Sequence, residues 1–287
     1  MNLYKNSLKN VLCVNAIPLL IAMVLAILNP QTNTQKNTDD RVQIKSKHTK
    51  IYTFPKGEKE YYQGHKIFDK LQKYNTKGLV TQSFQYKDDT LFSYINYYYD
   101  TSNLLLESKE FNSDNTLYLS IKYTHNKKGF VTRADYLRNT QKQYDDHRNP
   151  VEVEFEKYYK NLFTYIVYVN DFMGNVLEKR YYTDDDRLSF KYTFKYDFRY
   201  NKIETKFYNN KGSVSWRKKM KYNKEGLLTQ YKLYMNNRPA LLSKFRYQLD
   251  SNKNWIKRVE TRKLYNNFFA YDIKDNTIVT ENEIEYY

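Results

Sequence analysis

The stretch Tyr182–Tyr208 decides the fold, and it reads YTDDDRLSFKYTFKYDFRYNKIETKFY. Apolar and polar residues alternate along its central run. The apolar positions are Leu188, Phe190, Tyr192, Phe194 and Tyr196, and the polar positions between them are Ser189, Lys191, Thr193 and Lys195. Successive side chains of a strand point to opposite faces, so this period of two predicts a strand with one buried face. A short polar turn stands on each side of the run.

The same unit repeats along the chain. Aromatic residues recur every 12 to 14 positions, at Tyr74, Tyr86, Tyr99, Phe111, Tyr123 and Tyr136, and again at Tyr168, Tyr182, Tyr196, Tyr208, Tyr222, Tyr234 and Tyr247. Turn-forming residues follow them, as in Tyr74-Asn75-Thr76-Lys77-Gly78. Each unit holds a strand of about seven or eight residues and a turn of about four or five. The repeat therefore predicts an all-β fold, an antiparallel meander of about 16 short strands.

Most predicted strands carry one apolar and one polar face. The apolar positions include Leu117, Leu119, Ile121 and Tyr123, then Val214, Trp216, Met220 and Tyr222, then Leu241, Phe245 and Tyr247. The opposite positions include Ser120, Lys122, Arg217, Lys219, Lys221, Lys244 and Arg246. In the strand at 91–99 both faces are apolar, with Phe92, Tyr94 and Tyr98 opposite Leu91, Ile95, Tyr97 and Tyr99. That strand is expected to be buried on both sides or to expose an aromatic patch.

The number of strands limits the shape of the sheet. An open twisted sheet rarely exceeds about ten strands without curling or splitting. We therefore expect the sheet to roll up or to fold onto itself.

The last stretch, 277–287, alternates Ile278, Thr280, Asn282, Ile284 and Tyr286 on one face. Repeat arrays end in atypical units, so we interpret this stretch as a closing cap strand.

The N-terminal segment predicts export. Lys5 and Lys9 precede an apolar run at 11–28, whose length lies between a signal-peptide core and a membrane-spanning helix. We interpret residues 1–30 as a hydrophobic helix that is either a signal peptide, cleaved after Ala26, or a membrane anchor. Residues 31–50 are interpreted as a flexible polar tether and residues 51–287 as the repeat domain, with a bend or one decayed repeat at 138–159. The body is then expected in the cell envelope, whether periplasmic, at the outer surface or membrane-anchored.

Composition and charge narrow the classes of function. The 32 Tyr and 16 Phe, against 7 Gly and 5 Pro, favour strands and oppose disorder. A formal net charge of +16 fits either a solvated basic face or a polyanionic partner. No block of five or six like charges occurs. Cys13 is the only cysteine, so disulfides do not support the fold.

The sequence predicts neither catalytic nor metal-binding residues, and no cofactor. His48, His65, His125 and His147 are scattered without metal-ligand spacing, and neither a phosphate-binding glycine loop nor a nucleophile elbow occurs. Asp88-Asp89 and Asp184-Asp185-Asp186 are better explained as turns than as calcium sites. A carboxylate-dependent glycan-processing enzyme is a less favoured alternative. A transmembrane β-barrel is disfavoured because the strands are short and their second face carries lysine.

The units resemble the YD, or RHS-type, repeats of bacterial envelope and secreted proteins, over residues 60–287. The Tyr-Asp pair of that family is present at Tyr99-Asp100, Tyr144-Asp145 and Tyr196-Asp197, and its turn at Gly174-Asn175. Other units depart from the pattern, such as Tyr222-Asn223 and Phe111-Asn112. The resemblance implies a tyrosine-rich β-repeat scaffold at the cell envelope that binds carbohydrate or a protein partner. The toxin-enclosing shell of large members is not implied, because this chain is too short to form one.

These observations predict a non-enzymatic, exported binding or scaffold module of the cell envelope. Its partner is expected to be an envelope protein or an anionic polysaccharide, not nucleic acid, and residues 1–30 are a candidate membrane tether. Net charge and aromatic faces favour, as the alternative, a protein that binds anionic glycan or lipopolysaccharide. A protein partner would use the sheet edges or the aromatic residues at 94–99. The sequence does not indicate which residues bind.

Overall fold

The computed structural model describes residues 42–54, 64–138, 163–265 and 277–287, which form sixteen strands of one compact unit. The strands are β1 (Ile44–Phe54), β2 (His65–Tyr74), β3 (Val80–Lys87), β4 (Thr90–Tyr99), β5 (Leu105–Asn112), β6 (Leu117–His125), β7 (Val131–Arg138), β8 (Tyr165–Asn170), β9 (Val176–Tyr182), β10 (Leu188–Tyr196), β11 (Lys202–Tyr208), β12 (Val214–Tyr222), β13 (Leu228–Met235), β14 (Arg238–Leu249), β15 (Trp255–Leu264) and β16 (Thr277–Tyr286). No helix in this part of the chain is long and apolar enough to cross a membrane.

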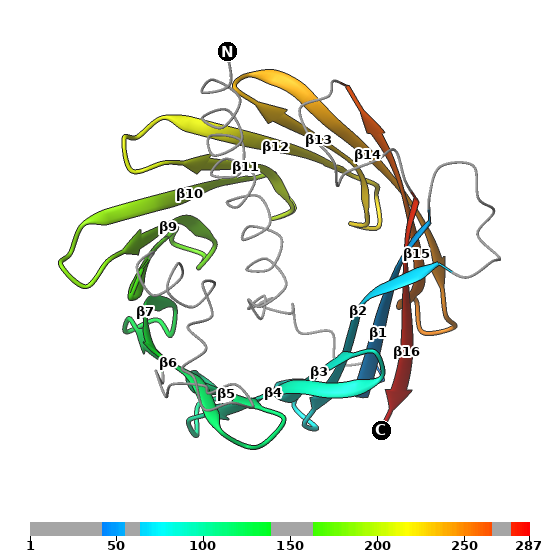
Figure 1. The fold of residues 1–287 in the computed structure, drawn as a ribbon, viewed down its shortest axis with the longest axis horizontal. Helices are drawn as coiled ribbons and strands as arrows, with labels where there is room; N and C mark the ends of the chain where they lie inside the picture. Colours follow the sequence, from blue (N-terminus) through cyan, green and yellow to red (C-terminus); the bar gives the residue numbers. More distant parts are fainter. Residues whose placement is uncertain (1–41, 55–63, 139–162, 266–276) are drawn as a thin grey trace, which may run out of the picture. The chain divides into compact units, whose positions relative to one another are not determined.

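The strands form one closed antiparallel barrel (Figure 1). Each strand pairs with its neighbours in the sequence, and β1 pairs with β16 to close the ring. The prediction of an all-β meander of about 16 strands is confirmed. The expected rolled or folded sheet is corrected, because no strand of the ring is left with an open edge. Similarly, β16 does not cap the array but pairs on both sides, with β15 and with β1.

Two sequence predictions change at the boundaries of the repeat domain. Strand β1 begins at Ile44, so residues 44–50 belong to the barrel rather than to a tether. The irregular patch at 139–162 lies outside the described residues, but β7 and β8 on either side of it pair directly. The hydrophobic helix predicted within residues 1–30 also lies outside the described residues, as does His147.

Most hairpin turns are built around one Asp or Asn side chain. In the turn after β10, Asp197 Oδ1 accepts hydrogen bonds from the backbone N–H groups of Arg199 and Asn201, both at 2.9 Å. Such side chains imitate a backbone turn, which explains their place directly after a strand. The same bonding to the backbone recurs at Asn75, Asp100, Asn126, Asp171, Asn209, Asn223 and Asp250.

A tyrosine at or near the end of several strands has a separate role. The hydroxyl of Tyr196 donates to the carbonyl of Val176, the first residue of the preceding strand, at 3.0 Å. Equivalent bonds run from Tyr99 to Val80, from Tyr222 to Lys202 and from Tyr247 to Leu228, each at 2.9 Å. The aromatic residue thus ties the end of one strand to the start of the strand before it. This gives a physical reason for the spacing of the repeat.

We expect the substitution Asp197→Ala to lower the free energy of unfolding by about 1–2 kcal/mol, because two backbone N–H groups lose their acceptor. The measurement is denaturant unfolding followed by circular dichroism. Asp184→Ala is the control, since Asp184 is an exposed aspartate in a similar turn, and its effect should stay within about 0.5 kcal/mol. Equal effects of the two substitutions would contradict this role of Asp197.

The core follows the alternation predicted for the strands. The aromatic residues Phe190, Tyr192, Phe207 and Trp216 are all buried and share one face of β10, β11 and β12. Their rings contact one another, with Phe207 stacked on Trp216 at 5.8 Å between centroids. The exposed lysines Lys219 and Lys221 lie on the opposite face. The predicted division of these strands into an apolar and a basic face is confirmed.

Candidate functional site

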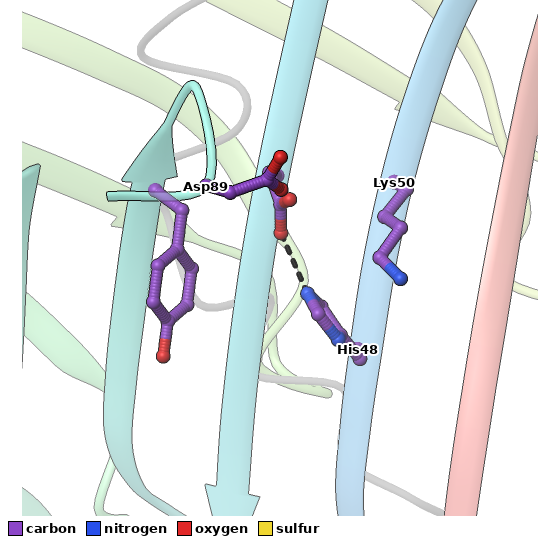
Figure 2. A pocket seen from close by; sticks show the side chains of 5 residues that line it. His48, Lys50 and Asp89 are labelled. Atoms are coloured by element: carbon purple, nitrogen blue, oxygen red, sulfur yellow. Dashed lines mark hydrogen bonds and ion pairs between the residues drawn. The ribbon is translucent and has the colours of Figure 1, made fainter. Parts of the chain in front are cut away.

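A shallow depression of about 290 Å³ lies where β1, β2 and the turn between β3 and β4 meet. Figure 2 shows His48 and Lys50 on β1 and Asp89 in that turn, around the depression. The His48 ring bonds through Nε2 to Asp69 Oδ1 at 2.6 Å. Among the described residues, no serine, threonine or cysteine is hydrogen-bonded to His48, so a nucleophilic triad is not formed here. Nor does this part of the chain contain a group of three or more metal-ligating side chains.

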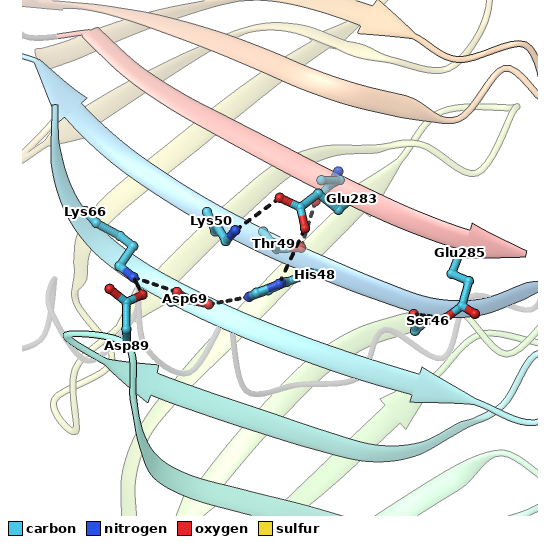
Figure 3. Close-up of polar contacts among 10 residues, drawn as sticks. Ser46, His48, Thr49, Lys50, Lys66, Asp69, Asp89, Glu283 and Glu285 are labelled. Carbon is cyan, nitrogen blue, oxygen red and sulfur yellow. Dashed lines mark hydrogen bonds and ion pairs between the residues drawn. The ribbon is translucent and has the colours of Figure 1, made fainter. Parts of the chain in front are cut away.

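Charged side chains around this depression connect the strands at the closure of the barrel (Figure 3). Lys66 bridges Asp69, at 2.8 Å, and Asp89, while Lys50 pairs with Glu283 at 3.1 Å. Burial alone would raise the pKa of Asp69, but hydrogen bonds from Lys66 and His48 outweigh it and lower that pKa. The pKa of Lys66 is raised by the same contacts. These ion pairs hold β1, β2 and β16 together, and we assign the cluster a structural role.

The alternation of side chains gives the barrel an outer and an inner face. Figure 3 looks at β1, β2 and β16 from outside, with strands of the opposite wall behind them, and His48 and Glu283 stand on the near side. Directly paired residues share a face. From this register, the following paired residues also lie on the outer face: Glu281–Lys257, Gln230–Lys244, Lys219–Lys232 and Lys206–Arg217. The paired residues on the inner face include Arg258–Thr280, Phe245–Glu260, Tyr231–Ser243, Lys218–Leu233 and Tyr192–Lys179.

The outer face of β10–β14 carries charge along the middle of its strands. The lysines there are Lys191, Lys206, Lys219, Lys232 and Lys244. A membrane-spanning barrel needs an apolar outward band, and a lysine at the bilayer midplane costs about 2–4 kcal/mol. This part of the wall is therefore unsuited to lipid hydrocarbon.

The inner face combines cations with aromatic rings. We call the residues Lys47, Lys179, Lys202, Lys218 and Arg258 the inner cation set. Each lies against a ring: Lys47 and Arg258 at 4.7 and 5.3 Å from the Trp255 centroid, Lys179 at 5.2 Å from Tyr168, Lys202 at 4.5 Å from Phe194, and Lys218 at 3.9 Å from Tyr231. Cation–π contacts of this kind hold the charged groups on the wall.

Burial lowers the pKa of all four lysines of this set. Burial lowers the pKa of Lys179 to about 7, with a further contribution from the nearby charge of Lys202. Burial also lowers the pKa of Lys47 and of Lys218 to about 8, and it lowers that of Lys202. Within the described chain no carboxylate forms an ion pair with any of the four. Such shifts mark positions where an added negative charge would be stabilising.

Glu260 is a carboxylate on the inner face whose charge acts on Lys218, and it already has several hydrogen-bond partners. One oxygen, Oε1, accepts from Arg262 at 2.7 Å, from Ser243 at 2.8 Å and from Tyr231 at 3.1 Å. Burial alone would raise the pKa of Glu260, but Arg262 and Ser243 outweigh it and lower that pKa. Glu260 therefore pairs with Arg262. Its charge also acts on Lys218, but burial outweighs that effect and the pKa of Lys218 stays lowered.

Two buried donors on the inner face also lack a partner. Trp216 Nε1 and Arg258 Nε are buried and have no hydrogen-bond acceptor in the described part of the chain. Buried donors without an acceptor are uncommon and each has a cost. Trp216 lies beside Tyr192, at 5.9 Å between ring centroids. Lys218 follows it two residues later on β12 and so points to the same face. The inner face thus offers unmatched donors and cations between flat rings, an arrangement that suits an anionic ligand with ring-shaped parts.

The sequence indicated the turn residues correctly but missed this inner set. Asp88 and Asp89 form a two-residue turn with φ of 49° and 62°, and Asp186 takes φ of 60° in its turn. The signal for the inner set was present in β12, where Lys218 occupies the apolar alternation between Trp216 and Met220. A lysine at an apolar position of a strand is therefore the sequence pattern that indicates a member of the inner cation set.

Strand β4 exposes an aromatic patch on the outer face, one of its two predicted outcomes. Phe92 is 58% exposed and Tyr98 42% exposed, whereas Tyr97 is buried on the inner face. Across the neighbouring strands, Tyr94 stacks on Phe111 at 5.0 Å between centroids.

Comparisons with known proteins add a likeness of shape alone. Neither a protein-family model nor a curated protein matches the chain. A porin-like protein from Bacteroides uniformis has a TM-score of 0.49 and 12% sequence identity, over 85% of this chain and 99% of that one. A porin-like protein from Bacteroides vulgatus gives 0.43 and 12%, over 86% and 99%, and a DUF1329 family protein from Desulfovibrio piger gives 0.28 and 10%, over 85% and 86%. At these TM-scores the likenesses support no conclusion about function.

Proposed function

We propose that this protein is a non-enzymatic binding protein of the cell envelope that holds an anionic glycan against the inner face of its barrel. The glycan class includes the phosphorylated sugars of lipopolysaccharide. The envelope location rests on the apolar run at 11–28, and kinship with YD-type repeats remains part of this proposal.

One observation carries the proposal: the four lysines of the inner cation set lie against aromatic rings, and within the described chain none of them forms an ion pair with a carboxylate. Aromatic rings supply stacking faces for sugar rings, and the cations supply charge for carboxylate, phosphate or sulfate groups. A barrel of 16 strands also encloses more space than its inward side chains fill.

The test is calorimetric titration of the full-length protein with a sulfated hexasaccharide and with an uncharged hexasaccharide. We expect the sulfated probe to bind and the double substitution Lys179→Met and Lys218→Met to weaken its affinity at least about tenfold. The matched control is Lys122→Met and Lys263→Met, which removes two lysines from exposed outer positions and should change affinity less than about twofold. Equal weakening by both pairs, or binding of neither saccharide, would refute the proposal.

A proton count gives a second readout. An anion beside Lys179 or Lys218 raises their lowered pKa values, so binding at pH 8 should take up protons from the buffer. Titrations in buffers of different ionisation enthalpy measure this uptake. Binding without proton uptake would place the ligand elsewhere on the protein.

A further inference from the structure

The outer face of β11–β14 forms a basic strip that the inner site does not use. The strip consists of Lys206, Arg217, Lys219, Lys221, Lys232, Lys244 and Arg246. Two of its cross-strand pairs join like charges directly, Lys206 with Arg217 and Lys219 with Lys232. Like charges directly opposite each other on a sheet are destabilising. This arrangement is therefore one that a negatively charged partner would relieve.

The strip has almost no acid of its own. Glu204 is the one carboxylate in the sequences of these four strands, and it pairs with Lys195 and Lys206. On the outer face at the closure of the barrel, where β1 pairs with β16, acidic and basic side chains are balanced. There Glu281, Glu283 and Glu285 each pair with a lysine, namely Lys257, Lys50 and Lys45. The imbalance of charge is thus local to one side of the barrel.

The chemistry of the strip differs from that of the inner face. Its two outward rings, Tyr208 and Tyr234, are covered by Lys191 at 5.0 Å and by Arg217 at 4.8 Å. A sugar chain would find charge here but no open stacking face. Anionic lipid head groups require no stacking face, and Lys and Arg side chains close to an anionic bilayer surface are attracted to it electrostatically.

We propose that the outer face of β11–β14 docks on the surface of an anionic lipid bilayer. The contact is peripheral, because lysines in the middle of the strands prevent insertion into hydrocarbon. Each lysine close to an anionic surface strengthens binding by about fivefold at moderate salt. The proposal concerns the face opposite to the inner cation set, so it stands or falls independently of the glycan site.

The experiment is co-sedimentation of the full-length protein with vesicles of phosphatidylcholine, with and without 30% phosphatidylglycerol. The ratio of the two partition coefficients isolates the electrostatic contribution, since any apolar segment of the chain contacts both kinds of vesicle. We expect a strong preference for the anionic vesicles. This preference should fall steeply as the salt concentration rises from about 50 to about 300 mM, because the Debye length shortens and screens the exposed charges.

Two variants with equal net charge identify the face. Changing Lys219, Lys221, Lys232 and Lys244 to glutamine should reduce the preference for anionic vesicles at least about twentyfold. Changing Lys45, Lys50, Lys122 and Lys257 to glutamine should reduce it less than about threefold. Circular dichroism establishes that both variants fold. Equal losses in the two variants would overturn the proposal, as would capture of dextran sulfate by the strip without any preference for anionic vesicles.

Discussion

Replacing Glu260 with leucine is expected to lower the free energy of unfolding by about 3–5 kcal/mol. Glu260 is 6% exposed and accepts three hydrogen bonds through one oxygen. Leucine would leave the Arg262 guanidinium, the fully buried Ser243 hydroxyl and the Tyr231 hydroxyl without this acceptor. It would also remove a negative charge that acts on Lys218. Breaking a buried ion pair by removing one partner is far more costly than exchanging both partners for apolar residues.

Denaturant unfolding of three variants separates the contributions of Glu260. Glu260→Gln keeps an acceptor oxygen and should cost about half as much as Glu260→Leu. Glu281→Leu breaks the outer pair with Lys257, whose side chains are 45% and 33% exposed, and should cost about 0–1 kcal/mol. A loss below about 1 kcal/mol for Glu260→Leu would show that the buried network does not support the barrel.

Replacing Lys179 with methionine is expected to raise the free energy of unfolding at pH 7 by about 2–4 kcal/mol while weakening glycan binding. Burial lowers the pKa of Lys179 from 10.5 to about 7. Between these values the unfolded chain holds a proton that the folded chain has released, so stability should rise with pH in this window. Below the folded value the cost of burying the charge is present in full. Methionine removes this cost and keeps most of the packing volume.

Unfolding measured from pH 6.5 to 9.5 tests the sign of this effect. The wild-type protein should gain stability across the range, and Lys179→Met should reduce the slope by at most about 1.4 kcal/mol per pH unit. Lys122→Met, at an exposed outer position, should leave the slope unchanged. Destabilisation by Lys179→Met at pH 7 would mean that the lysine has a compensating partner, which would count against an anion site at this position.

Local regularities of the sequence predicted much of the fold. The alternation in β10 and β12 assigned each side chain to a face, because a strand permits only two directions. The pairs Tyr196-Asp197 and Tyr222-Asn223 predicted turns, because their short polar side chains bond the backbone within four residues. These features depend on neighbours in the chain, and a single sequence records them directly.

Other features depend on residues that are far apart, and the sequence could not supply them. Closure required β1 to pair with β16, and no local pattern states that Thr49 lies opposite Asn282. Alternation places Lys218 on the same face as Trp216 and Met220, but it does not say which face becomes the inside of a barrel. The bonds of Glu260 to Tyr231 and Ser243 span 29 and 17 residues and follow from the register of three strands.

The pairing of β1 with β16 also fixes when, during synthesis, the barrel is completed. The other pairs join strands that are neighbours in the sequence, and hairpins with short turns form within microseconds. The first strand alone must wait for the last ten residues of the ring, and its Lys45 meets Glu285 across a separation of 240 residues. Until then the nascent chain has two free edges, which invite pairing with other chains. Truncation before Thr277 should therefore leave both edges of the sheet open and favour chains that join edge to edge.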